Sequence, residues 1–313
     1  MKAIVYNKKD PSDKLIYCDV EKPRPNNNEV LIKIVCASLN AADYRSMKMG
    51  ITPKKKIFGS AIAGRIESVG KNIRQFKPGD EVLGDLSDFG FGGLAEYAVA
   101  PEKALALKPA KISFEEAVTL PVAATTALKA LRDKGNIQKE QKVLIVGAAG
   151  GVGTFAVQLA KYYGTIITAV CGPKNMEQAR ALGADHVIDY TKEDFTKSNE
   201  RYDLIVAING NYPLLGYRKI LSSNGTYVMV GGGLLQIMKS IFFGWLLSFG
   251  KKKMRYLSAK SDQKDLDFVV KLLEYHKIKP VIERRYSLDR TAEAMQYLSE
   301  GHAQGKVIIM LEG

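Results

Sequence analysis

A glycine-rich turn offers the clearest chemistry in this 313-residue sequence. The continuous apolar run Val143–Val146 precedes it and is typical of a strand buried on both faces of a parallel sheet. After the turn, apolar residues recur at helical spacing until Gly164. A strand, a glycine turn and a helix together present backbone N–H groups to a pyrophosphate, although any strand-to-helix turn can use glycine. We therefore predict a dinucleotide site at Gly147, Gly150, Gly151, Val152 and Gly153.

The corner after the next predicted strand indicates which coenzyme would bind. An NAD site places Asp or Glu about 20 residues beyond the glycines, but this corner reads Cys171-Gly172-Pro-Lys174-Asn175. An aspartate about 4 Å from a phosphate charge would cost about 4 kcal/mol at an effective dielectric constant near 20. The missing acid, with Lys174 present, favours NADPH; the alternative is that Lys174 is a solvated turn residue.

Metal ligands are not evident in the sequence. The cysteines are Cys18, Cys36 and Cys171, and the histidines are His186, His276 and His302. No metal-ligand spacing joins them, and a catalytic zinc needs three protein ligands, so we expect no metal. Three scattered cysteines also indicate a reducing compartment. Because the N-terminus turns polar after three apolar residues, we expect no signal peptide and a cytoplasmic protein.

Composition is ordinary apart from charge. Hydrophobic residues make up 46% and charged residues 25%, as in globular proteins, whereas the net charge is +13 and the isoelectric point about 9.4. Such a charge suits anionic ligands, nucleic acid or an acidic membrane surface. No basic motif interleaved with aromatic residues supports nucleic-acid binding. We expect no nucleic-acid partner and leave a weak peripheral membrane contact open.

One apolar stretch, Leu234 to Phe249, has three interpretations. It is sixteen residues long and contains Lys239, which falls short of the roughly 20 apolar residues of a membrane span. It could form a helix at a dimer interface or over the substrate mouth, a membrane-surface anchor helped by Lys251 to Lys253, or plain core. The length of the stretch favours the first interpretation over an anchor, and we expect a homodimer.

The elements that would position these residues fall into two classes. Residues 1 to about 115 show short β-like runs separated by Pro, Gly, Asn and Asp clusters, without intervening helices, which suggests a barrel or sandwich. Ser113 and Glu116 have capping-box spacing at the start of a helical stretch that Pro121 would break. From Val143 onward strands and helices alternate, which predicts an α/β fold with a doubly wound parallel sheet.

In these features the sequence resembles the zinc-independent, quinone oxidoreductase-like branch of the medium-chain dehydrogenase/reductase superfamily. The likeness covers nearly the whole chain. It implies a GroES-like β-barrel catalytic domain at 1–117, completed by 262–313, and a Rossmann domain at 118–261. The landmarks are Glu29 to Lys33, Ser38 to Tyr44, Phe76 to Val82, Gly93 to Tyr97, Leu120 to Ala127, Gly147 to Gly153, Leu182 to Asp185 and Gly305 to Ile309.

The resemblance also implies the reacting residues. Zinc-dependent relatives have a cysteine near Tyr44 and a Gly-His-Glu near Gly59; here Ser60 and Ala61 follow Gly59. Without a metal, hydrogen-bond donors must stabilise charge on the substrate oxygen. The likeness points to Tyr44 and Asn40 as catalytic residues, with Tyr44 as donor or general acid. Alternatively, Tyr44 only shapes the pocket.

Further coenzyme contacts come from the same resemblance. Thr126 matches a threonine beside the nicotinamide, although a buried threonine could instead bond its own helix. Asn175 and Tyr190 stand at positions near the 2′-phosphate and adenine. Three more residues end predicted strands, where the ligand crevice of such sheets lies: Asn209, Gly231 and Gly232.

The function that follows is NADPH-dependent, zinc-independent hydride transfer to a small-molecule quinone or α,β-unsaturated carbonyl. Two alternatives remain. One is a reductase of another carbonyl or of an enoyl thioester. The other is a non-catalytic nucleotide-binding protein whose basic surface meets RNA or a membrane, which rests on net charge alone.

Overall fold

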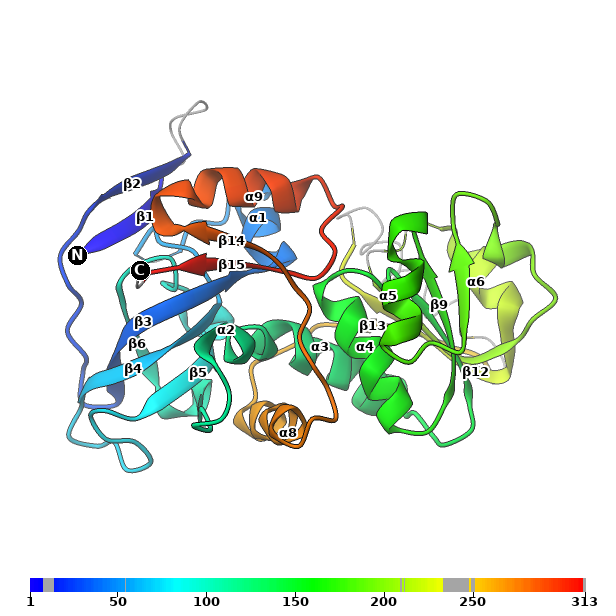
Figure 1. Cartoon of the computed structure of the whole chain (residues 1–313), viewed down its shortest axis with the longest axis horizontal. Coiled ribbons are helices and arrows are strands. Elements are labelled where there is room, and N and C mark those ends of the chain that lie inside the picture. Colours follow the sequence, from blue (N-terminus) through cyan, green and yellow to red (C-terminus); the bar gives the residue numbers. More distant parts are fainter. Residues whose placement is uncertain are drawn as a thin grey trace. The chain divides into compact units, whose positions relative to one another are not determined.

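The computed structural model describes residues 1–7, 14–53, 55–208, 210, 212–232, 248 and 251–311. The chain divides into two compact units. Unit 1 comprises Met1–Thr125 and Lys260–Gly313, and unit 2 comprises Thr126–Ala259. Both chain ends therefore belong to unit 1 (Figure 1).

Unit 1 is built mainly of antiparallel strands. Its strands are β1 (Lys2–Tyr6), β2 (Leu15–Asp19), β3 (Glu29–Leu39), β4 (Ala61–Val69), β5 (Glu81–Asp85), β6 (Tyr97–Pro101), β7 (Leu105–Leu107), β14 (Ile282–Ser287) and β15 (Lys306–Met310). Its helices are α1 (Ala41–Lys48), α2 (Phe114–Ala117), the π-helical turn η3 (Leu120–Ala124), α8 (Gln263–Glu274) and α9 (Thr291–Ser299).

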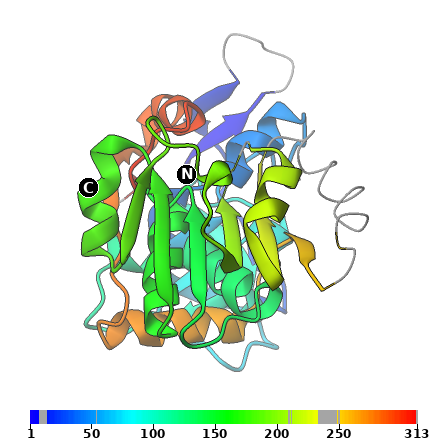
Figure 2. The same cartoon turned by 90° about the vertical axis from the view of Figure 1, so that its right-hand side faces the viewer.

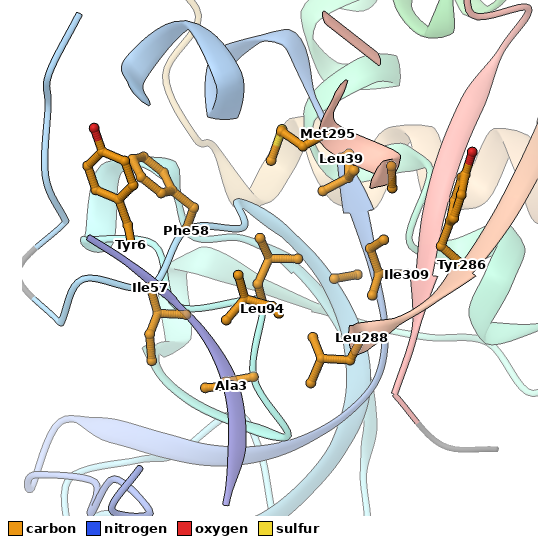
Figure 3. Close-up of a cluster of buried hydrophobic side chains, with 14 of the residues drawn as sticks. Ala3, Tyr6, Leu39, Ile57, Phe58, Leu94, Tyr286, Leu288, Met295 and Ile309 are labelled. Atoms are coloured by element: carbon orange, nitrogen blue, oxygen red, sulfur yellow. The ribbon is translucent and has the colours of Figure 1, made fainter. Parts of the chain in front are cut away.

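The strand order in unit 1 joins distant parts of the sequence. Its larger sheet runs β14-β15-β3-β4-β5-β7, with β6 also paired to β3, while β1 and β2 form a separate pair. The C-terminal strand β15 lies antiparallel to β3, so Val307 faces Leu39. Beneath this junction lies an apolar cluster that includes Phe58, Leu94 and Ile309, all fully buried (Figure 3). The cluster fixes the end of β3, from which α1 begins.

Unit 2 alternates strands and helices. Its strands are β8 (Lys142–Val146), β9 (Ile166–Cys171), β10 (His186–Asp189), β11 (Tyr202–Ile208), β12 (Leu221–Val230) and β13 (Lys253–Leu257). Its helices are α3 (Thr125–Lys129), which begins at the last residue of unit 1, the π-helical turn η4 (Ala130–Lys134), α4 (Gly151–Tyr162), α5 (Met176–Ala181) and α6 (Leu214–Ile220).

The six strands described in unit 2 are parallel neighbours in the order β10-β9-β8-β11-β12-β13. Counted along the chain this is 3-2-1-4-5-6, the order of doubly wound dinucleotide-binding sheets. Helix α4 packs on β8 and β9, α5 on β9 and β10, and α6 on β12 (Figures 1 and 2). The predicted doubly wound parallel sheet is confirmed.

One local prediction was wrong, and two others are confirmed. The first 115 residues do contain a helix, α1, which begins directly after β3. The predicted break near Pro121 is confirmed: α2 ends at Ala117, and Pro121 stands at the start of the π-helical turn η3, where its missing N–H is tolerated. The predicted capping box at Ser113 is present, since its hydroxyl accepts from the Glu116 amide.

The stretch Leu234 to Phe249 lies outside the described residues, except for Ser248. Within the described ranges, no helix has both the length and the apolar character that crossing a bilayer requires.

Candidate functional site

The glycine turn of unit 2 connects the end of β8 to the start of α4. Gly147 has φ +80°, and a side chain there would stand 2.4 Å from the Ile208 carbonyl oxygen. At Gly153 a Cβ would stand 2.1 Å from the Gly147 oxygen. Both distances are far below van der Waals contact, so these two glycines let the turn pack tightly against strand and helix.

Gly150 differs from its neighbours in facing open space. Apart from its chain neighbours, the nearest atom to a Cβ there would be the Gly147 oxygen, at 4.0 Å. Gly150 is also the N-cap of α4, and no side chain caps that helix end. The first N–H groups of a helix lack intrahelical partners and attract anions. Gly150, Gly151 and Val152 thus form a cradle that suits a pyrophosphate.

The strand register brings the other predicted residues to the same edge of the sheet. Val146 is aligned with Val170 on β9 and with Ala207 on β11, which in turn is aligned with Met229 on β12. The loops after these four strands therefore emerge together. They carry the glycine turn, the corner Cys171 to Asn175, and Gly231 and Gly232, which have φ of +66° and +133°. Asn209 lies outside the described residues.

The corner after β9 contains no carboxylate of its own. Gly172 leads into a short 3₁₀ turn, Pro173–Asn175, in which Lys174 is exposed. Tyr190 lies across this corner: it is 50% exposed, and its hydroxyl would be 3.4 Å from a Cβ on Gly172. A cation and a phenol hydroxyl thus lie at the corner where the resemblance places a ribose phosphate.

Asp189, at the end of β10, is a carboxylate that no sequence motif singled out. Its Oδ1 accepts hydrogen bonds from the Thr191 amide (2.9 Å) and hydroxyl (2.7 Å). These bonds hold the pKa of Asp189 below its usual value. Burial, with the charge of Asp189, raises the pKa of the Cys171 thiol. Asp189 therefore shapes the loop carrying Tyr190, and Cys171 contributes a neutral, buried thiol.

In unit 1, Asn40 and Asp43 begin helix α1. The backbone N–H of Asn40 donates to Asp43 Oδ2 at 2.8 Å. The side-chain Nδ2 of Asn40 donates to the Ser38 carbonyl (2.9 Å) and to Ser60 Oγ (3.2 Å). The Asn40 Oδ1 accepts from the Lys306 ammonium at 2.6 Å. Both hydrogens of the Asn40 side-chain amide are thus used inside unit 1. These bonds fit a positioning role for Asn40 rather than contact with a ligand, and Tyr44 stays the candidate donor.

Tyr44 follows Asp43 on α1 and is partly exposed. Its ring lies 5.7 Å from the Arg45 guanidinium carbon and 5.5 Å from the Lys48 ammonium, and it packs against the apolar cluster of Figure 3. Among the described residues none hydrogen-bonds to its hydroxyl. That hydroxyl is available to donate to a ligand.

Thr126 lies in the first turn of α3 and is 9% exposed. The neighbouring Thr125, rather than Thr126, bonds the preceding turn through the Pro121 carbonyl. This arrangement weakens the alternative that Thr126 serves only its own helix.

In the described part of the chain, no group of three or more His, Cys, Asp and Glu side chains is placed to hold a metal ion.

Comparison with known proteins shows the family to which the chain belongs. Residues 26–110 match the Alcohol dehydrogenase GroES-like domain family, and residues 182–309 match a family described as Zinc-binding dehydrogenase. The chain is 34% identical over 309 residues to the Arabidopsis thaliana "Chloroplast envelope quinone oxidoreductase homolog", covering 94% of this chain and 93% of that protein. The chain belongs to the medium-chain dehydrogenase/reductase superfamily. It falls in the quinone oxidoreductase-like branch, with a GroES-like domain and a Rossmann-like domain.

Other relatives agree with this membership. The quinone oxidoreductase from Coxiella burnetii has a similar structure, with a TM-score of 0.89 and 27% identity over 100% of this chain and 99% of that chain. The Arabidopsis thaliana "NADPH-dependent alkenal/one oxidoreductase, chloroplastic" is 32% identical over 328 residues, covering 99% of this chain and 79% of that protein.

Proposed function

We propose that this protein is an NADPH-dependent, zinc-independent oxidoreductase that reduces quinones or α,β-unsaturated carbonyl compounds. The main support for a preference for NADPH is the corner after β9. Lys174 and the Tyr190 hydroxyl lie there, where NAD-binding sheets have an acidic residue. The printed names of the relatives support the substrate class, since they include quinone and alkenal/one oxidoreductases.

The residues of unit 2 fit a dinucleotide coenzyme. Gly150 leaves space for a pyrophosphate, and the uncapped end of α4 supplies N–H donors to it. Lys174, Asn175 and Tyr190 would hold the 2′-phosphate and adenosine. Contacts nearer the nicotinamide would come from Thr126, Asn209, Gly231 and Gly232, with Cys171 and Gly172 lining the adenosine side.

The chain's own role in the reaction is to orient the substrate and stabilise charge. NADPH supplies, when bound, the hydride that reduces the substrate. Tyr44 donates a hydrogen bond to the substrate oxygen, where negative charge grows, and can pass it a proton. Asn40 holds the first turn of the helix that carries Tyr44. A preorganised donor of this kind replaces the Lewis acid that zinc provides in other branches.

Alternative functions are distinguishable. A reductase of another carbonyl or of an enoyl thioester would use the same coenzyme site with a different pocket. A non-catalytic protein with a basic RNA- or membrane-binding surface has only the net charge of +13 in its favour.

The test is steady-state loss of NADPH absorbance with a panel of quinones, enones, enoyl thioesters and simple ketones, repeated with NADH and with a metal chelator. We expect turnover of quinones or enones, preference for NADPH, and no effect of chelation. Tight NADPH binding without turnover of any compound would refute the enzyme, and stoichiometric zinc by elemental analysis would refute zinc independence.

Two further properties belong to the same proposal. We expect a homodimer, which sedimentation equilibrium tests, and residence in the cytoplasm, which cell fractionation tests.

A further inference from the structure

A lysine in the core of unit 1 is not explained by the reaction proposed above. Lys306, the first residue of β15, is 3% exposed. Its ammonium donates to the Leu39 carbonyl at 3.2 Å and to Asn40 Oδ1 at 2.6 Å. Burying an ammonium group is unfavourable unless it is paired and hydrogen-bonded. The two hydrogen bonds offset part of this cost and tie β15 to the end of β3.

Its opposite charge is Asp43, which is 0% exposed. Asp43 Oδ2 accepts from the Asn40 amide at 2.8 Å and from Ser60 Oγ at 3.5 Å. Asn40 thus lies between the two charges, accepting from Lys306 and donating to Asp43. Burial raises the pKa of Asp43 most; among the described charged groups, Lys306 lowers this pKa and Asp85 on β5 raises it.

This set of bonds converges on the first turn of α1. It joins that turn to the end of β3, to Ser60 before β4, and to β15. Helix α1 has only eight residues, and a helix so short is marginal without tertiary contacts. Its placement, and that of Tyr44 immediately after Asp43, depends on what holds its first turn.

We propose that Lys306 and Asp43, connected through Asn40 and Ser60, are positioning residues that hold Tyr44 in place for reduction of the substrate. This role rests on the proposed function of Tyr44. Lys306 fixes the junction of β3 and α1, and Asp43 anchors the first turn of the helix. A displacement of about 1 Å at a reacting group can lower a rate about a hundredfold.

The first measurement is hydrogen exchange of the peptide spanning residues 41–50 in the parent protein and in Lys306→Met. We expect faster exchange in the variant. Lys108→Met is a matched control, because Lys108 is also buried at 8% exposure and bonds Ile112 O (2.6 Å) and Glu81 (2.8 Å) at another place in unit 1. It should leave exchange of this peptide unchanged. Parent-like exchange in Lys306→Met would overturn the proposal, whether or not any substrate is turned over.

The second measurement is a kinetic cycle of Lys306→Met and Tyr44→Phe. Lys306→Met should lower kcat about a hundredfold with the NADPH dissociation constant unchanged. In the Tyr44→Phe background it should cost little more, because it acts through the same hydroxyl. A further hundredfold loss there would indicate general structural damage and overturn the proposal.

Folding and function are separated by two controls. If Lys306→Met does not fold, Asp43→Asn/Lys306→Met removes both charges, leaves none unpaired, and should fold; faster exchange at 41–50 and reduced kcat are expected for it as well. If Tyr44→Phe alone leaves kcat unchanged, the proposed donor role of Tyr44 fails, and the exchange experiment still decides whether the pair holds α1.

Discussion

Lys306 and Asn40 are 266 positions apart in the chain, yet the Lys306 ammonium donates to Asn40 Oδ1 at 2.6 Å. Asp43 accepts from the backbone of the same asparagine. Burial raises the pKa of Asp43 to about 6 and lowers the pKa of Lys306 to about 8. For both residues, desolvation thus outweighs the attraction of the partner, and the neutral form is favoured relative to the unfolded chain.

These shifts predict how stability depends on pH. Between about pH 4 and 6 the folded protein holds a proton on Asp43 that the unfolded chain has released, so stability falls as pH rises. Between about pH 8 and 10.5 the unfolded chain holds a proton on Lys306 that the folded protein lacks, so stability rises with pH. The combined contribution of Asp43 and Lys306 to the free energy of unfolding is lowest from pH 6 to 8, where each group lowers that free energy by up to about 3 kcal/mol.

Urea unfolding across this range, for the parent and Asp43→Asn/Lys306→Met, measures that contribution. The difference in unfolding free energy, parent minus variant, should fall through the acidic range, stay level near neutrality and rise in the basic range. A difference that is constant with pH would contradict both shifts.

The sequence predicts the unit 2 site better than the unit 1 network, for a physical reason. The glycine turn follows a strand and precedes a helix, and parallel strands bring all their carboxyl ends to one edge, so local pattern suffices there. The Asn40-x-x-Asp43 spacing also indicates a helix start, and this is the local signal that could have predicted α1. The burial of Lys306 was not readable, because it depends on the pairing of β15 with β3.

Two glycine substitutions should separate packing from coenzyme binding. Gly153→Ala places a Cβ 2.1 Å from a backbone oxygen, so we expect a loss of stability of about 1–3 kcal/mol. Gly150→Ala finds open space and should change stability by less than about 1 kcal/mol, while weakening coenzyme binding because the methyl group enters the phosphate cradle. Thermal unfolding and calorimetry with NADPH provide the two readouts. Equal effects of both variants on binding and on stability would contradict this assignment.

Lys174→Ala should weaken NADPH selectively. Loss of a charged hydrogen bond to the 2′-phosphate costs about 1.5–3 kcal/mol, or about 10- to 100-fold in dissociation constant. The NADH dissociation constant should not change, because NADH lacks that phosphate. Lys197→Ala is the matched control, since Lys197 is an exposed lysine of unit 2 that pairs with Asp194 at 3.6 Å. Equal weakening of both coenzymes by Lys174→Ala would mean that the lysine does not read the phosphate.

Tyr227 on β12 is fully buried, and within the described ranges its hydroxyl has no hydrogen-bond partner. Its ring lies 4.8 Å from that of Tyr217, so the aromatic packing does not depend on the hydroxyl. An unsatisfied buried hydroxyl costs about 1–3 kcal/mol, and Tyr227→Phe should therefore raise the free energy of unfolding by about 1 kcal/mol.

Tyr6→Phe is the contrasting control, because the hydroxyl of the buried Tyr6 donates to the Met47 carbonyl at 3.3 Å. Losing that bond should lower stability by about 1 kcal/mol. Urea unfolding of both variants decides the matter, and a destabilised Tyr227→Phe would show that the phenol has a partner and contributes to the core of unit 2.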